Sequence, residues 1–161
     1  MILKIISFII ILIFLPNIYG LNGKQLLDFS VTQYSKVIKT VNTGSDYPSE
    51  GIPTSSSWRT TPGYEWRRFE WTYGFYPGIL WQLFNLTKEN HWKELAIRAT
   101  DGLFKNQFRE DTHDIGFMIM SSYGDGYRVT KNSSYPKIIV NAANSLAKRF
   151  NCTQNNQQST I

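Results

Sequence analysis

The sequence repeats itself with a period of 42–43 residues, and this repeat constrains the fold more than any other feature. The pair Gly74-Phe75 recurs as Gly116-Phe117, at an offset of 42 residues. Three further matches have an offset of 43: Trp92 with Tyr135, Ala99 with Ala142, and Leu103 with Leu146. Each copy runs from an apolar segment, through a polar turn, to an amphipathic segment. A repeat of this length with two helices per unit is typical of stacked αα-hairpins.

Apolar residues spaced three and four apart predict an all-α fold, with helices at residues 22–41, 75–86, 90–106, 115–123 and 134–149. The expected turns are residues 85–89 and 124–133, the second because its start is rich in glycine. Gly44 suits a left-handed end to the first helix. Residues 45–70 hold three prolines and no helical period, so we expect an irregular segment that aromatic side chains keep ordered. Such hairpins build either an open solenoid or a closed α/α toroid.

Residues 1–20 have the pattern of a secretory signal peptide. Lys4 precedes an apolar run at residues 5–15, and Pro16 ends that run before the small residue Gly20. The run is too short for a bilayer, which needs about 20 residues. We therefore expect a secreted or lumenal protein without a membrane anchor after cleavage; the alternative is a buried N-terminal helix. The expected organisation is a signal at 1–20, a partial helical domain at 21–151 and a polar, divergent tail at 152–161.

Three Asn-x-Ser/Thr sequons, at Asn85, Asn132 and Asn151, are the expected glycosylation sites of an exported chain. Cys152 is the single cysteine, so the chain can form neither an internal disulfide nor a closed zinc site. The net charge of +5 is modest and is spread along the chain, which argues against nucleic acid as a partner. No motif for a metal or an organic cofactor is present. The oligomeric state has no signature in the sequence.

The residues that could carry chemistry lie where each predicted hairpin begins. In a toroid these starts share one end of the molecule, so aromatic, histidine and carboxylate side chains would gather at one mouth. Asp114 is the leading catalytic candidate, with His113 beside it, although Thr112 or Asp114 could equally cap the next helix. Trp71 could stack on a sugar ring or lie in the core.

At these positions the sequence resembles glycoside hydrolase family 88, the unsaturated glucuronyl or unsaturated chondroitin disaccharide hydrolases. Residues 71–81 (WTYGFYPGILW) are similar to the family segment W-T-x-G-F-x-P-G-x-L-W, and residues 112–118 (THDIGFM) to T-H-D-x-G-F-M. Residues 122–130 and 143–151 continue the resemblance in the same order. It covers about residues 24–151, which is nearly all of the chain after the expected signal.

The resemblance implies the first part of a six-hairpin (α/α)6 toroid. The implied substrate is an oligosaccharide, derived from a glycosaminoglycan, with an unsaturated uronic acid at its non-reducing end. Hydrolysis would proceed by hydration of the 4,5 double bond instead of the usual displacement at the anomeric carbon. The motif assigns the catalytic carboxylate to Asp114, substrate contacts to His113 and stacking on the sugar to Trp71. It implies no metal and no cofactor.

The sequence also departs from the family pattern. A second catalytic Asp is expected on a helix about sixty residues after the first, and that position lies beyond residue 161. We therefore expect a truncated chain with little or no hydrolase activity of its own, because general acid–base catalysis contributes about 10²–10⁴-fold. The alternative is a non-catalytic, secreted helical-repeat protein that binds carbohydrate or protein through its aromatic face.

Overall fold

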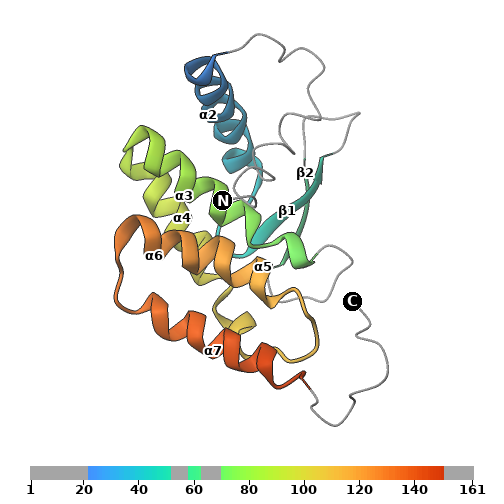
Figure 1. The fold of residues 1–161 in the computed structure, drawn as a ribbon. Helices are drawn as coiled ribbons and strands as arrows, with labels where there is room; N and C mark the ends of the chain where they lie inside the picture. The colour runs from blue at the N-terminus through green and yellow to red at the C-terminus, as the bar shows by residue number, and fades with distance from the viewer. Residues whose placement is uncertain (1–21, 52–57, 63–69, 151–161) are drawn as a thin grey trace.

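The computed structural model describes residues 22–51, 58–62 and 70–150, and these residues form a helical array with one β-hairpin (Figure 1). The α-helices are α2 (Gly23–Thr40), α3 (Phe75–Thr87), α4 (Asn90–Asp101), α5 (Ile115–Ile119), α6 (Asp125–Thr130) and α7 (Tyr135–Ala147). Strands β1 (Asp46–Gly51) and β2 (Trp58–Pro62) pair antiparallel. Short 3-10 segments occur at η1 (Glu70–Thr72) and η2 (Phe104–Phe108), and a π-helical segment, η3, at Met120–Gly124.

The predicted repeat is confirmed, and the turns of its two copies share the same backbone conformation and the same hydrogen bond. Helices α3 and α4 form one hairpin, and the rod α5–η3–α6 forms the next hairpin with α7. The two turns use the same construction 43 residues apart. Lys88 and Lys131 both have a left-handed backbone, with φ of 63° and 58°. The preceding hydroxyls, on Thr87 and Thr130, each accept a backbone N–H two residues later, at 3.2 Å.

The predicted turn at residues 124–133 is wrong at its start, because residues 125–130 are helical and the true turn follows Thr130. The glycines that suggested a turn serve close packing instead. A Cβ on Gly126 would lie 2.7 Å from the Tyr135 ring and 3.0 Å from the Trp81 ring. A glycine in this helix therefore brings the two hairpins together.

The end of one helix and the structure of one segment also differ from the predictions. Helix α4 ends at Asp101, not at residue 106, and a Cβ on Gly102 would lie 2.2 Å from the Gly44 carbonyl oxygen. Gly44 itself is left-handed as predicted, with φ of 107°. The segment expected to be irregular contains the hairpin β1–β2, which has a bulge between Pro48 and Glu50. The predictions of a signal peptide at residues 1–20, a glycosylation site at Asn151 and a polar tail that includes Cys152 concern residues outside the described ranges.

Tyrosine and tryptophan side chains fill the core, and two of them donate hydrogen bonds to α4. Tyr47 on β1 is fully buried, donates its hydroxyl to the Ala99 carbonyl of α4 and stacks on Tyr73 at 5.3 Å between ring centroids. The Trp81 indole N–H donates to Thr100 Oγ1 at 2.9 Å and ties α3 to α4. The hydrogen bonds of Tyr47 and Trp81 offset the cost of burying their polar atoms, whereas Trp92 Nε1 and the Tyr123 hydroxyl are buried without a partner among the described residues.

A buried glutamine connects the second hairpin to the segment before it. The Gln107 side chain donates to the Phe104 carbonyl and accepts from Asn141 Nδ2 of α7, both at 2.8 Å. The Gln107 backbone carbonyl also accepts from Ser145 Oγ, at 2.8 Å. These bonds fix α7 beside η2 and so position the loop that leads to residues 112–114.

Candidate functional site

Three aromatic rings from the starts of both hairpins meet at one end of the array. Trp71, from η1, lies 5.8 Å from Phe75 and 6.1 Å from Phe117, measured between ring centroids, and both contacts are edge-on. Phe75 and Phe117 are 6.2 Å apart. Trp71 remains 38% exposed and Phe117 39% exposed. Trp71 is therefore not a core residue, and its exposed surface is available for a ligand.

A close backbone contact brings these rings together. A Cβ on Gly74 would lie 2.3 Å from the Phe117 carbonyl oxygen, and one on Gly78 would lie 2.8 Å from the Ser121 carbonyl oxygen. Helix α3 therefore contacts the rod α5–η3 directly along its first turns. This contact places the start of α3 beside the start of α5, as the toroid-like arrangement of hairpins predicts.

The predicted pair His113 and Asp114 lies at the start of α5. His113 Nε2 is 3.3 Å from Asp114 Oδ1, and the two side chains are 65% and 20% exposed. The Thr112 hydroxyl is 3.3 Å from Asp114 Oδ2 and accepts the Asp114 backbone N–H at 3.1 Å. The Asp114 carboxylate makes no capping bond to α5. The Thr112 bond reaches the backbone of Asp114, which precedes α5, so neither side chain caps that helix, and the carboxylate lies between two polar side chains.

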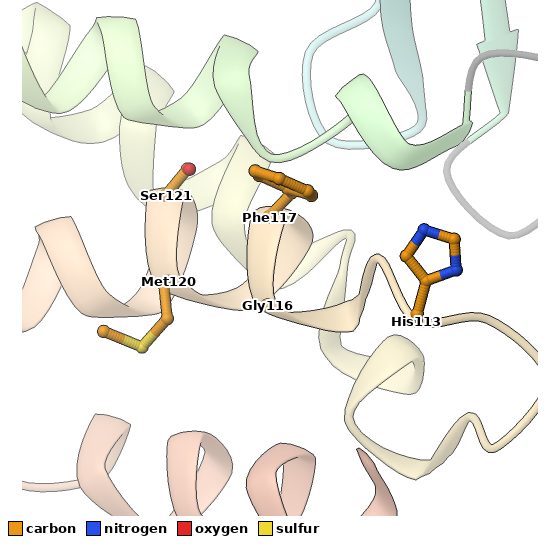
Figure 2. Close-up of a pocket in the computed structure, with 5 residues that line it drawn as sticks. All are labelled: His113, Gly116, Phe117, Met120 and Ser121. Atoms are coloured by element: carbon orange, nitrogen blue, oxygen red, sulfur yellow. The ribbon is translucent and has the colours of Figure 1, made fainter. Parts of the chain in front are cut away.

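An open hollow of about 280 Å³ runs along one side of α5, next to this pair. It is lined by His113, Gly116, Phe117, Met120 and Ser121 (Figure 2). The lining combines an aromatic ring, a thioether and exposed helix backbone with a few polar groups. Sites for small ligands commonly have this composition. The other lining residues lie three, four, seven and eight residues after His113, and this helical spacing is the sequence signal that could have identified them.

Three other carboxylates near this segment pair with basic side chains. Asp125 pairs with Arg128, and Glu110 binds Lys148 at 2.6 Å between Oε1 and Nζ. Asp111 pairs with Arg109 at 2.9 Å, and this bond lowers the pKa of the Asp111 carboxyl. The lining of the hollow contains no carboxylate. In the described part of the chain, Asp114 is thus the acid next to this hollow.

Over residues 22–51, 58–62 and 70–150, no three His, Cys, Asp or Glu residues come together as a metal site would require. In the same ranges, none of the helices combines the length and apolar character needed to span a bilayer.

Comparison with curated proteins finds glycosidases of one kind. The chain is 30% identical over 124 residues to an unsaturated glucuronyl hydrolase of Formosa agariphila, which corresponds to 75% of this chain and 31% of that protein. It is 26% identical over 135 residues to an unsaturated chondroitin disaccharide hydrolase of Streptococcus agalactiae, covering 81% of this chain and 33% of that protein. The chain thus spans about a third of the length of these relatives. No family model matches it.

Solved structures give the same result for the fold. A crystal structure of an unsaturated glucuronyl hydrolase specific for heparin superposes with a TM-score of 0.68 at 35% identity, over 78% of this chain and 32% of that one. A mutant of the Streptococcus agalactiae enzyme, complexed with dGlcA-GalNAc6S, superposes with a TM-score of 0.65 at 20% identity, over 77% of this chain. The fold is therefore all-α and corresponds to about a third of an (α/α)6 toroid.

Proposed function

We propose that this chain, a homologue of the unsaturated glucuronyl hydrolases of family 88 over about a third of their length, binds oligosaccharides that begin with an unsaturated uronic acid. The observation that carries the proposal is the meeting of Trp71, Phe117 and the His113–Asp114 pair at one end of the array. An aromatic face suits the apolar face of a pyranose ring, and the polar pair suits its substituents. The Streptococcus agalactiae structure was solved with a sugar of this class, dGlcA-GalNAc6S.

The chemistry that follows from the family is hydration of a double bond. A proton is delivered to carbon 4 and a water hydroxyl adds to carbon 5, so that the double bond is consumed and a hemiketal forms. The hemiketal then opens and the glycosidic bond is lost. In this chain Asp114 would act in catalysis or stabilise the reacting carbon atoms. His113 would bind the substrate, and Trp71 would stack on the sugar ring. The bonds from Thr112 and His113 hold the carboxylate in place for this role.

The first test compares binding of an unsaturated chondroitin disaccharide, followed by ligand-observed NMR, among matched variants. Trp71→Ala should weaken binding about fivefold or more, because the stacking surface is lost. Asp114→Asn should leave binding partly intact, because the amide keeps the shape of the carboxylate. Tyr127→Ala is the matched control for Trp71, since Tyr127 is 37% exposed on α6; Asp28→Asn on α2 is the control for Asp114. Binding that responds to neither Trp71 nor Asp114 would contradict the proposed site.

The same preparation tests catalysis. We expect this chain to consume the double bond far more slowly than a full-length relative, because the lining of the hollow contains no carboxylate that could act together with Asp114. The missing general acid–base group is worth about 10²–10⁴-fold. Turnover near the rate of a full-length enzyme would show that the described residues already contain the whole catalytic apparatus, contrary to this account.

A further inference from the structure

Gly116 is a helical glycine whose missing side chain has no structural use in the described residues. A Cβ would clash, closer than 3.0 Å, at Gly74, Gly78, Gly102 and Gly126, and Gly44 has a positive φ that favours glycine. At Gly116 a Cβ would meet nothing within 4 Å, and the backbone conformation is an ordinary helical one. Neither packing nor backbone geometry explains the choice of glycine there.

Glycine in a helix also destabilises the protein, because it loses more backbone freedom on folding than alanine does. Gly116 lies in α5, which continues through η3 into α6 and forms part of the second hairpin. No described neighbour requires a glycine at this position, and unlike Gly23, which also has open space around it, Gly116 lines the hollow, so a reason for the glycine can be sought there. That reason is a ligand that approaches the backbone.

The place of Gly116 in the hollow shows where that ligand would lie. Gly116 is exposed and stands between Phe117 and Met120, with His113 at the start of the same helix (Figure 2). The two large side chains point to different sides of the helix and leave the backbone at Gly116 uncovered between them.

We propose that Gly116 is a specificity-determining residue, against whose bare backbone the unsaturated uronic acid ring is seated. The proposal deepens the proposed function and rests on it. The double bond between carbons 4 and 5 flattens this ring relative to a saturated pyranose, so the ring can approach the helix closely. A side chain at residue 116 would occupy the space that the ring needs, and His113 and Phe117 would then be too far from it to make contact.

The test is the exchange Gly116→Ala, which should have opposite effects on stability and binding. The midpoint of thermal unfolding should rise by about 1–4 °C, because alanine favours the helix and clashes with nothing. Binding of the unsaturated chondroitin disaccharide should weaken about fivefold or more, because the methyl group overfills the hollow. Gly116→Leu should weaken it further. Gly23→Ala on α2, the other glycine with open space around it, should leave binding unchanged.

The outcomes separate this inference from the proposed function. If the unchanged chain does not bind the disaccharide, the proposed function fails for this sugar and the inference fails with it. If the unchanged chain binds and the Gly116→Ala and Gly116→Leu variants bind equally well, the inference alone is overturned. A lower midpoint of unfolding for Gly116→Ala would also overturn it, since the glycine would then have a structural role.

Discussion

At the scale of single residues, the segment 112–114 divides its tasks between neighbours. The Thr112 hydroxyl accepts the Asp114 backbone N–H and so performs the local turn-stabilising role. The Asp114 carboxylate is thereby left for the two side-chain contacts, with His113 and Thr112. The Asp114 carboxylate makes no capping bond to α5 and contacts an exposed histidine, an arrangement that fits the proposed contact with a ligand.

The two sequons within the described residues differ in geometry, and this gives a prediction if the chain is exported. Asn132 Oδ1 accepts both the N–H and the hydroxyl of Ser134, at 3.0 and 2.9 Å, and both residues lie at an exposed turn. Asn85 lies in the last turns of α3, where Thr87 donates its hydroxyl to the Leu83 carbonyl. We expect a glycan mainly at Asn132.

The measurement is glycopeptide mass spectrometry of the chain secreted from a eukaryotic host, before and after enzymatic removal of the glycans. Asn132→Gln should remove most of the attached mass, and Asn85→Gln should remove little. Full occupancy at Asn85 with an empty Asn132 would contradict the structural argument. Failure of the chain to enter the medium at all would contradict the expectation of a signal peptide at residues 1–20.

The sequence could identify Asp114, His113 and Trp71, because their motifs place them at the starts of the hairpins. It could not identify Phe75 and Phe117 as partners of Trp71. Their contact depends on how closely α3 approaches the rod of the second hairpin, and that distance is set by Gly74. Periodicity assigns a residue to a helix face but does not give the separation between two helices.

At the scale of elements, the sequence does not show whether a glycine marks a turn or a close contact between helices, and the structure decides between the two. Gly124 and Gly126 suggested a turn from their composition, but both lie in the rod between α5 and the true turn after Thr130. The hairpin β1–β2 was missed because its strands are short and contain prolines, which are normally confined to edges and bulges of sheets. What orders β1 is Tyr47, whose hydroxyl binds a carbonyl of α4, 52 residues away in the sequence.

Gly126→Ala tests the close contact between the two hairpins. Its methyl group would press on the rings of Trp81 and Tyr135, both of them buried. We expect unfolding to require about 1–3 kcal/mol less, because overpacking outweighs the gain in helix propensity. Urea denaturation gives the free energy, and Gly23→Ala, where the new methyl group meets nothing, is the control. An increase in stability for Gly126→Ala would mean that the hairpins are not packed as described.

At the scale of the whole molecule, buried tyrosines make the fold sensitive to alkali. Burial raises the pKa of Tyr47, Tyr76, Tyr123 and Tyr135 above the ordinary value of about 10. These tyrosines ionise more easily in the unfolded chain than in the folded one. Their contribution to stability is therefore fully present below pH 10 and is lost as the pH rises above that value.

An alkaline titration measures this effect. Tyrosine ionisation, followed by ultraviolet absorbance, should lag behind that of model tyrosine and then rise steeply, together with the loss of helical circular dichroism. The free energy of unfolding should fall steadily above pH 10. Complete ionisation of all tyrosines near pH 10 with the helices intact would contradict the burial of these hydroxyls.

The chain spans about a third of the length of its relatives, and the proposed site is one part of a sugar-binding site. The repeat and the motifs were sufficient to predict that part of the fold. The most direct test is a titration of backbone amide NMR shifts with the unsaturated chondroitin disaccharide and with its saturated counterpart. We predict saturable shifts at residues 71–75 and 112–121, larger for the unsaturated sugar. Shifts confined to the opposite end, around residues 87–90 and 131–134, or equal responses to both sugars, would contradict the account.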